Sequence, residues 1–143
     1  MAKKNKGTFS YLEAQQALEN IAERCTKDNI VYELLRIFCG YGDAGIQRII
    51  DGRGNDARDG RTILVKKLIA YRATENGLFG DDNLYEIIEA MQKDSSIYKK
   101  EPRLYVASDG KRIIAYDPKE EDLYDNDISL MWKDFEFFKP LAG

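Results

Sequence analysis

Histidine is absent from this chain of 143 residues, and cysteine occurs only twice. Without an imidazole, Ser-His-Asp and Cys-His catalysis and most zinc sites are excluded. The two cysteines, Cys25 and Cys39, lie in helical patterns and are too few for a metal site made of cysteine alone, so we expect small core residues. Any metal would be a hard cation held by carboxylates.

Long apolar runs are absent as well. None approaches the roughly 18 to 20 residues of a membrane span. The lysine-rich start at residues 1–7 is not followed by the apolar segment of a signal peptide. With 43% apolar and 33% charged residues, the composition is typical of a soluble globular protein, and the length suits one domain over residues 1–143. We therefore expect a cytoplasmic location and no membrane partner.

Charge is distributed unevenly along the chain. Residues 42–74 carry seven basic and four acidic side chains, whereas residues 75–143 carry nine basic and sixteen acidic ones. A basic middle in a chain of net charge −3 can mark a contact with a polyanion. A mixed, solvated surface explains the same pattern equally well.

Helical spacing of apolar residues marks the first half of the chain and its end. A capping box of Ser10 and Glu13 starts the first predicted helix. The predicted helices cover residues 10–25, 28–40, 44–50 and 82–93, and a last helix begins near Ser129 with Met131, Phe135 and Phe138 inward. Exposed loops are expected over residues 53–60 and 76–81.

Strand patterns fill the remaining positions. Residues 62–74 have β-type bulk, and Lys66-Lys67 interrupts the alternation, so a strand with a bulge or an edge is expected. Asp109-Gly110 lies between two β-type runs and predicts a tight type I′ hairpin over residues 103–117. A short strand is expected near residues 123–128. The order predicts an α+β domain: N-terminal helices, a small, mainly antiparallel sheet, and a C-terminal helix.

Motifs for nucleotide phosphates and for adenine methylation are missing. No Gly-x-x-x-x-Gly-Lys-Ser/Thr loop and no Rossmann glycine pattern is present. The Asn/Asp-Pro-Pro-Tyr/Phe motif of adenine methyltransferases is absent too. No cofactor and no adenosylmethionine chemistry are therefore expected in this segment.

A metal-dependent nuclease of the PD-(D/E)xK type is one candidate. Such a site needs an acidic residue on one strand and Asp/Glu-x-Lys on the next, so that two carboxylates and a lysine meet a divalent cation. Lys66 or Lys67 could supply the lysine, and Asp56 or Asp59 the upstream carboxylate. The positions two residues before the lysines are apolar, so the second carboxylate is missing and no metal site is expected.

A helix-turn-helix is another candidate. Two predicted helices are joined by a turn that contains Gly42, and the second carries Gln47 and Arg48. These side chains could meet DNA, with Lys66 and Lys67 on backbone phosphates. An ordinary helical hairpin with solvated charges is the other interpretation.

Five stretches share a pattern with a known enzyme family. They are a leucine-rich helix at residues 31–35, a short helix with a Gly-x-x-Asn turn at 46–55, a lysine-rich strand at 64–71, a hairpin at 104–117, and Asp-Phe-Glu-Phe-Phe-Lys-Pro-Leu-Ala-Gly at 134–143. Together they resemble the N-terminal region of type IIG/IIS restriction-modification enzymes, which carry DNA cleavage and adenine methylation on one polypeptide.

The resemblance implies the N-terminal piece of such an enzyme, inactive alone. Its partners would be DNA and the polypeptide beyond Gly143, and the parent would use S-adenosylmethionine and Mg²⁺. With the basic middle, it leads to the hypothesis of an accessory domain that assists DNA engagement and positions the catalytic parts. Phosphate contacts are expected at Arg48, Arg53, Arg58, Lys66 and Lys67.

Two alternatives stay open beside this hypothesis. The domain could be a degenerate cleavage domain that uses Asp56 or Asp59 with Lys66 or Lys67. It could also be a purely structural docking domain, in which case its last helix would present Phe135, Phe137 and Phe138 as an exposed patch.

Overall fold

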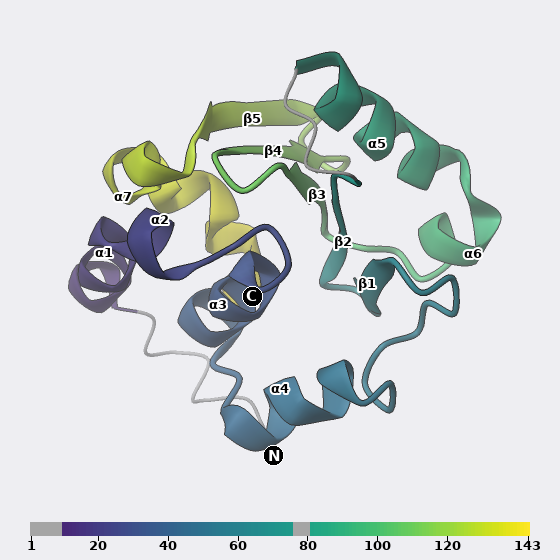
Figure 1. The fold of residues 1–143 in the computed structure, drawn as a ribbon, viewed down its shortest axis with the longest axis horizontal. Helices are drawn as coiled ribbons and strands as arrows, with labels where there is room; N and C mark the ends of the chain where they lie inside the picture. Colours follow the sequence, from purple (N-terminus) through teal and green to yellow (C-terminus); the bar gives the residue numbers. More distant parts are fainter. Residues whose placement is uncertain (1–9, 76–80) are drawn as a thin grey trace.

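A five-stranded sheet runs through the centre of the structure, with strand order β1-β2-β3-β4-β5 (Figure 1). The strands are β1 (Thr62–Val65), β2 (Ile69–Ala73), β3 (Leu104–Ser108), β4 (Arg112–Asp117) and β5 (Asp122–Asp127). Neighbouring strands are antiparallel except β2 and β3, which run parallel. The expectation of a small, mainly antiparallel sheet is confirmed.

This computed structural model describes residues 10–75 and 81–143. The lysine-rich start at residues 1–7 and residues 76–80 of the expected loop lie outside the described residues. The last residue of that expected loop, Asp81, begins a helix. The helical elements are α1 (Tyr11–Glu19), α2 (Ile21–Arg24), α3 (Ile30–Cys39), α4 (Asp43–Ile50), α5 (Asp81–Lys93), α6 (Ser95–Tyr98), η2 (Ile128–Leu130), α7 (Met131–Asp134) and η3 (Phe135–Ala142). No helix in these ranges is long and apolar enough to cross a membrane.

Helices cover both faces of the sheet, so the architecture is α+β as expected. Helices α1 to α4 and the C-terminal segment lie on one side, and α5 and α6 on the other (Figure 1). Successive side chains of a strand point to opposite faces. In β2, Ile69 and Tyr71 therefore join the first core, whereas Ala70 joins the second with Leu84 and Ile88 of α5.

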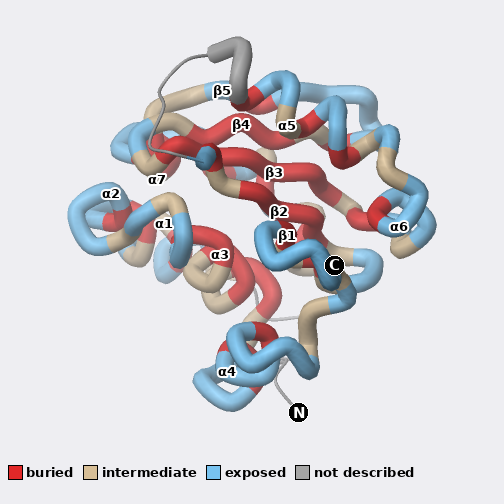
Figure 2. Tube along the Cα trace, turned by 45° about the vertical axis from the view of Figure 1, so that its right-hand side comes forward, coloured by how far each residue is buried: buried red, intermediate tan, exposed pale blue. Residues whose placement is uncertain are grey.

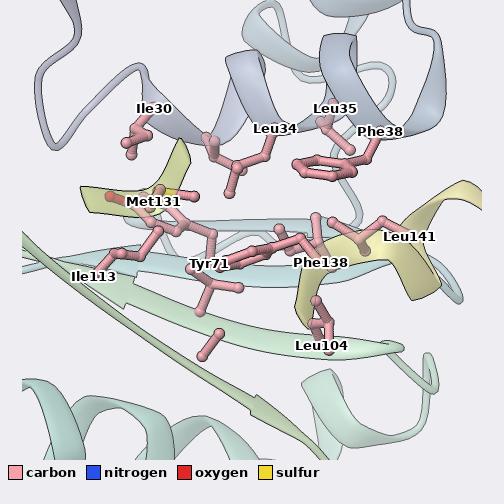
Figure 3. Close-up of a cluster of buried hydrophobic side chains, with 14 of the residues drawn as sticks. Ile30, Leu34, Leu35, Phe38, Tyr71, Leu104, Ile113, Met131, Phe138 and Leu141 are labelled. Atoms are coloured by element: carbon pink, nitrogen blue, oxygen red, sulfur yellow. The ribbon is translucent and has the colours of Figure 1, made fainter. Parts of the chain in front are cut away.

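The larger core lies between α3, the C-terminal segment and the sheet. Figure 3 shows Leu34 and Phe38 of α3 above Tyr71 of β2, with Phe138 and Leu141 of η3 closing the side. All five side chains are almost fully buried. The central strands β2 to β4 are mostly buried, whereas α4 and the loops around the sheet are mostly exposed (Figure 2).

The stretch at residues 62–74 is a hairpin of two strands, so the prediction of one continuous strand with a bulge or an edge at Lys66-Lys67 is wrong in its continuity, although β1 does form the edge of the sheet. The backbone N–H of Leu68 donates to the carbonyl oxygen of Val65 at 2.9 Å, and Lys67 has φ +65°. Burying a lysine ammonium is unfavourable. The turn exposes both Lys66 and Lys67, whereas a continuous strand, with alternate side chains on opposite faces, would bury one of them. The turn has no Gly, Pro or Asn, which explains why the sequence pattern does not reveal it.

The hairpin of β3 and β4 is confirmed, but its turn is not type I′. That turn needs φ > 0 at both central residues. Gly110 has φ +94°, whereas the described non-glycine residues with positive φ are Lys67, Glu101 and Glu121, and Asp109 is not among them. Instead, the Asp109 carboxylate accepts hydrogen bonds from the backbone N–H groups of Lys111, at 2.9 Å, and of Arg112, at 2.8 Å.

The C-terminal segment packs on its own domain as predicted for three of its side chains. Met131, Phe135 and Phe138 are buried. Phe137 is half-buried, with its ring centroid 5.5 Å from that of Phe138 and 5.4 Å from that of Tyr124. The exposed phenylalanine patch that a docking domain would show is therefore not formed by residues 135, 137 and 138.

Candidate nucleic-acid interface

Lys66 and Lys67 occupy the exposed turn between β1 and β2. The turn is fixed by its own hydrogen bond and by the chain that leads into β3. The backbone N–H groups of Arg103 and Leu104 donate to the carbonyl oxygen of Leu68 at 3.0 and 3.1 Å. These bonds begin the parallel pairing of β2 with β3, so the turn is held firmly although its side chains are free to extend into solvent.

A second pair of lysines lies beside this turn. The backbone N–H of Lys67 donates to the carbonyl oxygen of Lys100 at 2.9 Å, which brings the connection between α6 and β3 against the turn between β1 and β2. Lys99 and Lys100 thus join Lys66 and Lys67 in a surface that we call the lysine corner. Sequence reasoning missed Lys99 and Lys100, because their proximity depends on the parallel pairing of two distant strands.

The lysine corner is only weakly neutralised. Lys67 Nζ lies 3.6 Å from Glu101 Oε1, and Lys100 Nζ lies 3.9 Å from Asp56 Oδ2. Exposed ion pairs of this kind contribute about 0–1 kcal/mol, so they leave the lysines available for other anions. Within the described ranges, no carboxylate lies within 4.0 Å of the ammonium of Lys66 or Lys99.

The three arginines expected to contact phosphate lie on α4 and on the loop that follows it. Arg48 is exposed in the last turn of α4. Arg53 is already paired, with Nη2 2.7 Å from Asp51 Oδ2, and this hydrogen bond lowers the pKa of Asp51. Arg58 donates to backbone carbonyl groups of its own loop. The ion pair of Asp56 with Lys100 connects this loop to the lysine corner.

Arg72 forms a separate basic group that is buried. Its side chain is 8% exposed and lies 3.3 Å from Asp59 Oδ2 and 3.9 Å from Asp94 Oδ2. Arg72 Nε also donates to Thr62 Oγ1 at 2.7 Å. Thr62 in turn donates its hydroxyl to Asp59 Oδ2 at 2.6 Å. Each group in this cluster therefore has partners inside the protein.

Asp59 is held in its ionised form by this cluster. Partial burial alone would raise the pKa of Asp59. The hydrogen bonds from the Thr62 hydroxyl and from the backbone N–H groups of Arg61 and Thr62, together with the charge of Arg72, outweigh burial and lower the pKa to about 2. The carboxylate is thus an acceptor for the start of β1, which is a structural role.

Of the two carboxylates proposed for a metal-dependent nuclease, Asp59 lies apart from Lys66 and Lys67, whereas Asp56 lies on their side of the sheet. The backbone N–H of Asp56 donates to the carbonyl oxygen of Leu64 at 2.8 Å, and its carboxylate lies 3.9 Å from Lys100 Nζ. Asp59 precedes β1 and pairs with Arg72, whereas Lys66 and Lys67 follow β1 at its other end. Arg72 of β2, which pairs with Asp59, does not complete the motif either. The residue two positions before Arg72 is Ala70, so the second carboxylate is missing there as well. In the part of the chain that the structure describes, no three acidic or cysteine side chains are placed to hold a metal ion.

The helix pair α3 and α4 retains the features that suggested a helix-turn-helix. Gly40 ends α3 in the left-handed conformation with φ 73°, and Gln47 and Arg48 are exposed on α4. Ile46 and Ile49 anchor α4 to the core, while Ile50 is 54% exposed. The exposed face of α4 is compatible with a DNA contact, which stays a prediction.

Comparison with family models, curated proteins and solved structures finds no match to this chain. Its function is therefore inferred from the chemistry of the described surfaces.

Proposed function

We propose that this domain binds DNA through the lysine corner, as an accessory N-terminal domain of a restriction-modification enzyme. The observation that carries the proposal is the hydrogen bond from the Lys67 N–H to the Lys100 carbonyl oxygen, 2.9 Å long, which places two lysine pairs side by side. Phosphate contacts supply most of the sequence-independent affinity of proteins for DNA, and lysines on a fixed backbone suit that task.

The footprint of the DNA is limited by the charges around the lysine corner. Arg48 and Arg58 are exposed on the side of α4, so they extend the basic surface in that direction. On the other side, Glu120 and Glu121 are exposed in the turn between β4 and β5, at the same end of the sheet. Their repulsion of phosphate confines the DNA to the side of β1, β2 and α6. Arg53 contributes less, because Asp51 already neutralises it.

Duplex DNA binding at several salt concentrations tests this proposal. Each lysine that neutralises a phosphate adds about 0.9 to the slope of log affinity against log salt. We expect Lys66→Ala/Lys67→Ala to weaken binding and to reduce the slope by about two. Fluorescence anisotropy with a labelled duplex gives both quantities.

The matched control removes two exposed lysines elsewhere. Lys111 lies at the turn between β3 and β4, at the opposite end of the sheet, and Lys133 lies on α7. Lys111→Ala/Lys133→Ala changes the net charge equally, so we expect nearly wild-type affinity. Equal affinity of the wild type and Lys66→Ala/Lys67→Ala, or equal weakening by both double variants, contradicts a specific role of the lysine corner.

The restriction-modification context has its own test in the complete polypeptide. We expect the lysine variants to lower methylation and cleavage of DNA at physiological salt and to leave the catalytic rate at saturating DNA unchanged. A full-length enzyme whose DNA affinity does not depend on these lysines would remove the accessory role.

A further inference from the structure

Tyr98 is a large aromatic residue whose side chain is not packed into either core. It ends α6 and is 48% exposed. The other tyrosines with marked exposure have side-chain partners: Tyr85 donates to Asp125 Oδ2 at 2.7 Å, and Lys139 Nζ lies 4.9 Å from the centroid of the Tyr11 ring. In the described part of the chain, no hydrogen bond or ring contact engages the side chain of Tyr98.

The backbone that carries Tyr98 is fixed. Asp94 caps α6 by accepting hydrogen bonds from the backbone N–H of Ser96 at 2.9 Å and from its hydroxyl at 2.7 Å. Ile97 is buried against the second core at 2% exposure. The backbone N–H of Glu101 donates to the carbonyl oxygen of Tyr98 at 3.0 Å. A ring on such a short, pinned turn loses little freedom when a ligand covers it.

Tyr98 is followed directly by Lys99 and Lys100 of the lysine corner. An exposed aromatic residue close in the chain to several lysines is a combination with which proteins hold single-stranded nucleic acid: bases stack on the ring while the cations follow the phosphates. In a duplex the bases are already stacked on each other, so the ring has no face to bind. The two features together therefore favour an unpaired nucleotide over a paired one.

We propose that Tyr98 is a stacking platform for an unpaired base and that the lysine corner binds single-stranded DNA more tightly than duplex of equal length. This inference rests on the proposed DNA-binding function and names its ligand more narrowly. The ring contributes only to the single-stranded complex, whereas the lysines contribute to both.

Anisotropy titrations with a labelled 12-nucleotide single strand and the matching 12-base-pair duplex test the inference. We expect Tyr98→Ala to bind the single strand roughly tenfold more weakly and the duplex almost unchanged. Tyr98→Phe keeps the ring and should bind both DNAs like the wild type. Because Tyr98 is exposed, each variant should keep the thermal unfolding midpoint of the wild type, which separates a lost contact from a lost fold.

The same titrations with Lys66→Ala/Lys67→Ala separate two kinds of failure. In the first, the lysine variant loses affinity for both DNAs, and Tyr98→Ala changes the affinity for neither DNA or changes both affinities equally. That result overturns the stacking role and leaves the DNA-binding function standing. Unchanged affinity of the lysine variant for both DNAs overturns the DNA-binding function and with it the inference.

A fluorescence readout reports stacking directly. The chain has one tryptophan, Trp132, so Tyr98→Trp in a Trp132→Phe background places a single indole at the proposed platform. We expect the single strand to quench this indole and the duplex to quench it much less. Tyr85→Trp in the same background, on the exposed side of α5, is the control that should not be quenched. Equal quenching at positions 98 and 85 contradicts the proposal.

Discussion

Two groups of basic side chains come from the same short stretch of sequence and end in opposite surroundings. Arg72 is buried between two carboxylates and a hydroxyl, with 8% of its side chain exposed. Lys67 is 68% exposed and has one distant ion pair. Arg72 and Lys67 both carry one positive charge, but they differ in burial and in the number of their ion-pair partners. Arg72 is committed to the fold, whereas the lysines keep their charge available for a ligand.

The largest expected effect is on Arg72. Arg72→Met keeps an apolar stem of similar length to the aliphatic part of arginine but leaves Asp59, Asp94 and Thr62 without their cation. Breaking a buried ion pair costs about 3–5 kcal/mol, and the partial exposure of Asp59 places the expected loss near the lower end, about 3 kcal/mol. Urea unfolding measures it. The control Arg58→Met, on the exposed loop, should change the free energy of unfolding by less than about 0.5 kcal/mol. A loss at Arg72 as small as the control would break the comparison.

Two buried threonines allow a matched test of the polar cluster. Thr62 is 2% exposed and binds both Arg72 and Asp59, whereas Thr74 is 4% exposed and its Oγ1 has no partner in the described part of the chain. A buried hydroxyl without a partner costs about 1–3 kcal/mol. Thr74→Val should therefore raise the free energy of unfolding by about 1 kcal/mol, and Thr62→Val should lower it by about as much. Chemical denaturation that gives both changes the same sign would contradict this account.

The pKa of Asp59 predicts a pH dependence of stability. It is lowered to about 2 in the folded state, below the value of about 3.9 in an unfolded chain. The stabilisation is therefore complete above pH of about 4 and is lost as the pH falls toward 2. Because a third of the side chain is exposed and solvent screens its charge, we expect about 1 kcal/mol.

Asp59→Asn isolates this contribution. Urea unfolding between pH 2.5 and 5 should show a shallower pH dependence in Asp59→Asn than in the wild type. Asp56→Asn, at an exposed carboxylate 3.9 Å from Lys100, should keep the wild-type slope. Equal flattening by both substitutions would assign the effect to general charge and not to the cluster around Arg72.

The smallest expected effect is on the lysines. Lys66→Ala/Lys67→Ala should change the free energy of unfolding by less than about 0.5 kcal/mol, because both side chains are exposed and, among the described residues, only Lys67 has an ion pair, at 3.6 Å from Glu101. Thermal and urea unfolding of the double variant measure it. A large loss of stability would mean that the lysines hold the turn between β1 and β2, and the contrast with Arg72 would disappear.

Regular patterns made much of the fold predictable. The helical faces of α3 and α5, the hairpin around Gly110 and the inward side chains Met131, Phe135 and Phe138 follow from local periodicity. The turn at Lys66-Lys67 was missed because a lysine adopts the left-handed conformation there without any glycine signal. The type of turn at Asp109 was missed because its side chain, rather than a second residue of positive φ, satisfies the backbone.

The candidate site was predictable only in part. Lys66 and Lys67 were marked by the local charge pattern. Lys99, Lys100 and Tyr98 were not, because they join the site only through the parallel pairing of β2 with β3, which no local pattern encodes. The burial of Arg72 was hidden for the same reason, since its partners Asp59 and Asp94 come from two other segments of the chain.

The most direct test of the central claim is the salt dependence of duplex DNA binding in three variants. Lys66→Ala/Lys67→Ala and Lys99→Ala/Lys100→Ala should each reduce the slope of log affinity against log salt by about two, and the four-site variant by about four. That result would show that two lysine pairs from distant segments act as one DNA-binding surface. A four-site variant with the affinity and the slope of the wild type would contradict it.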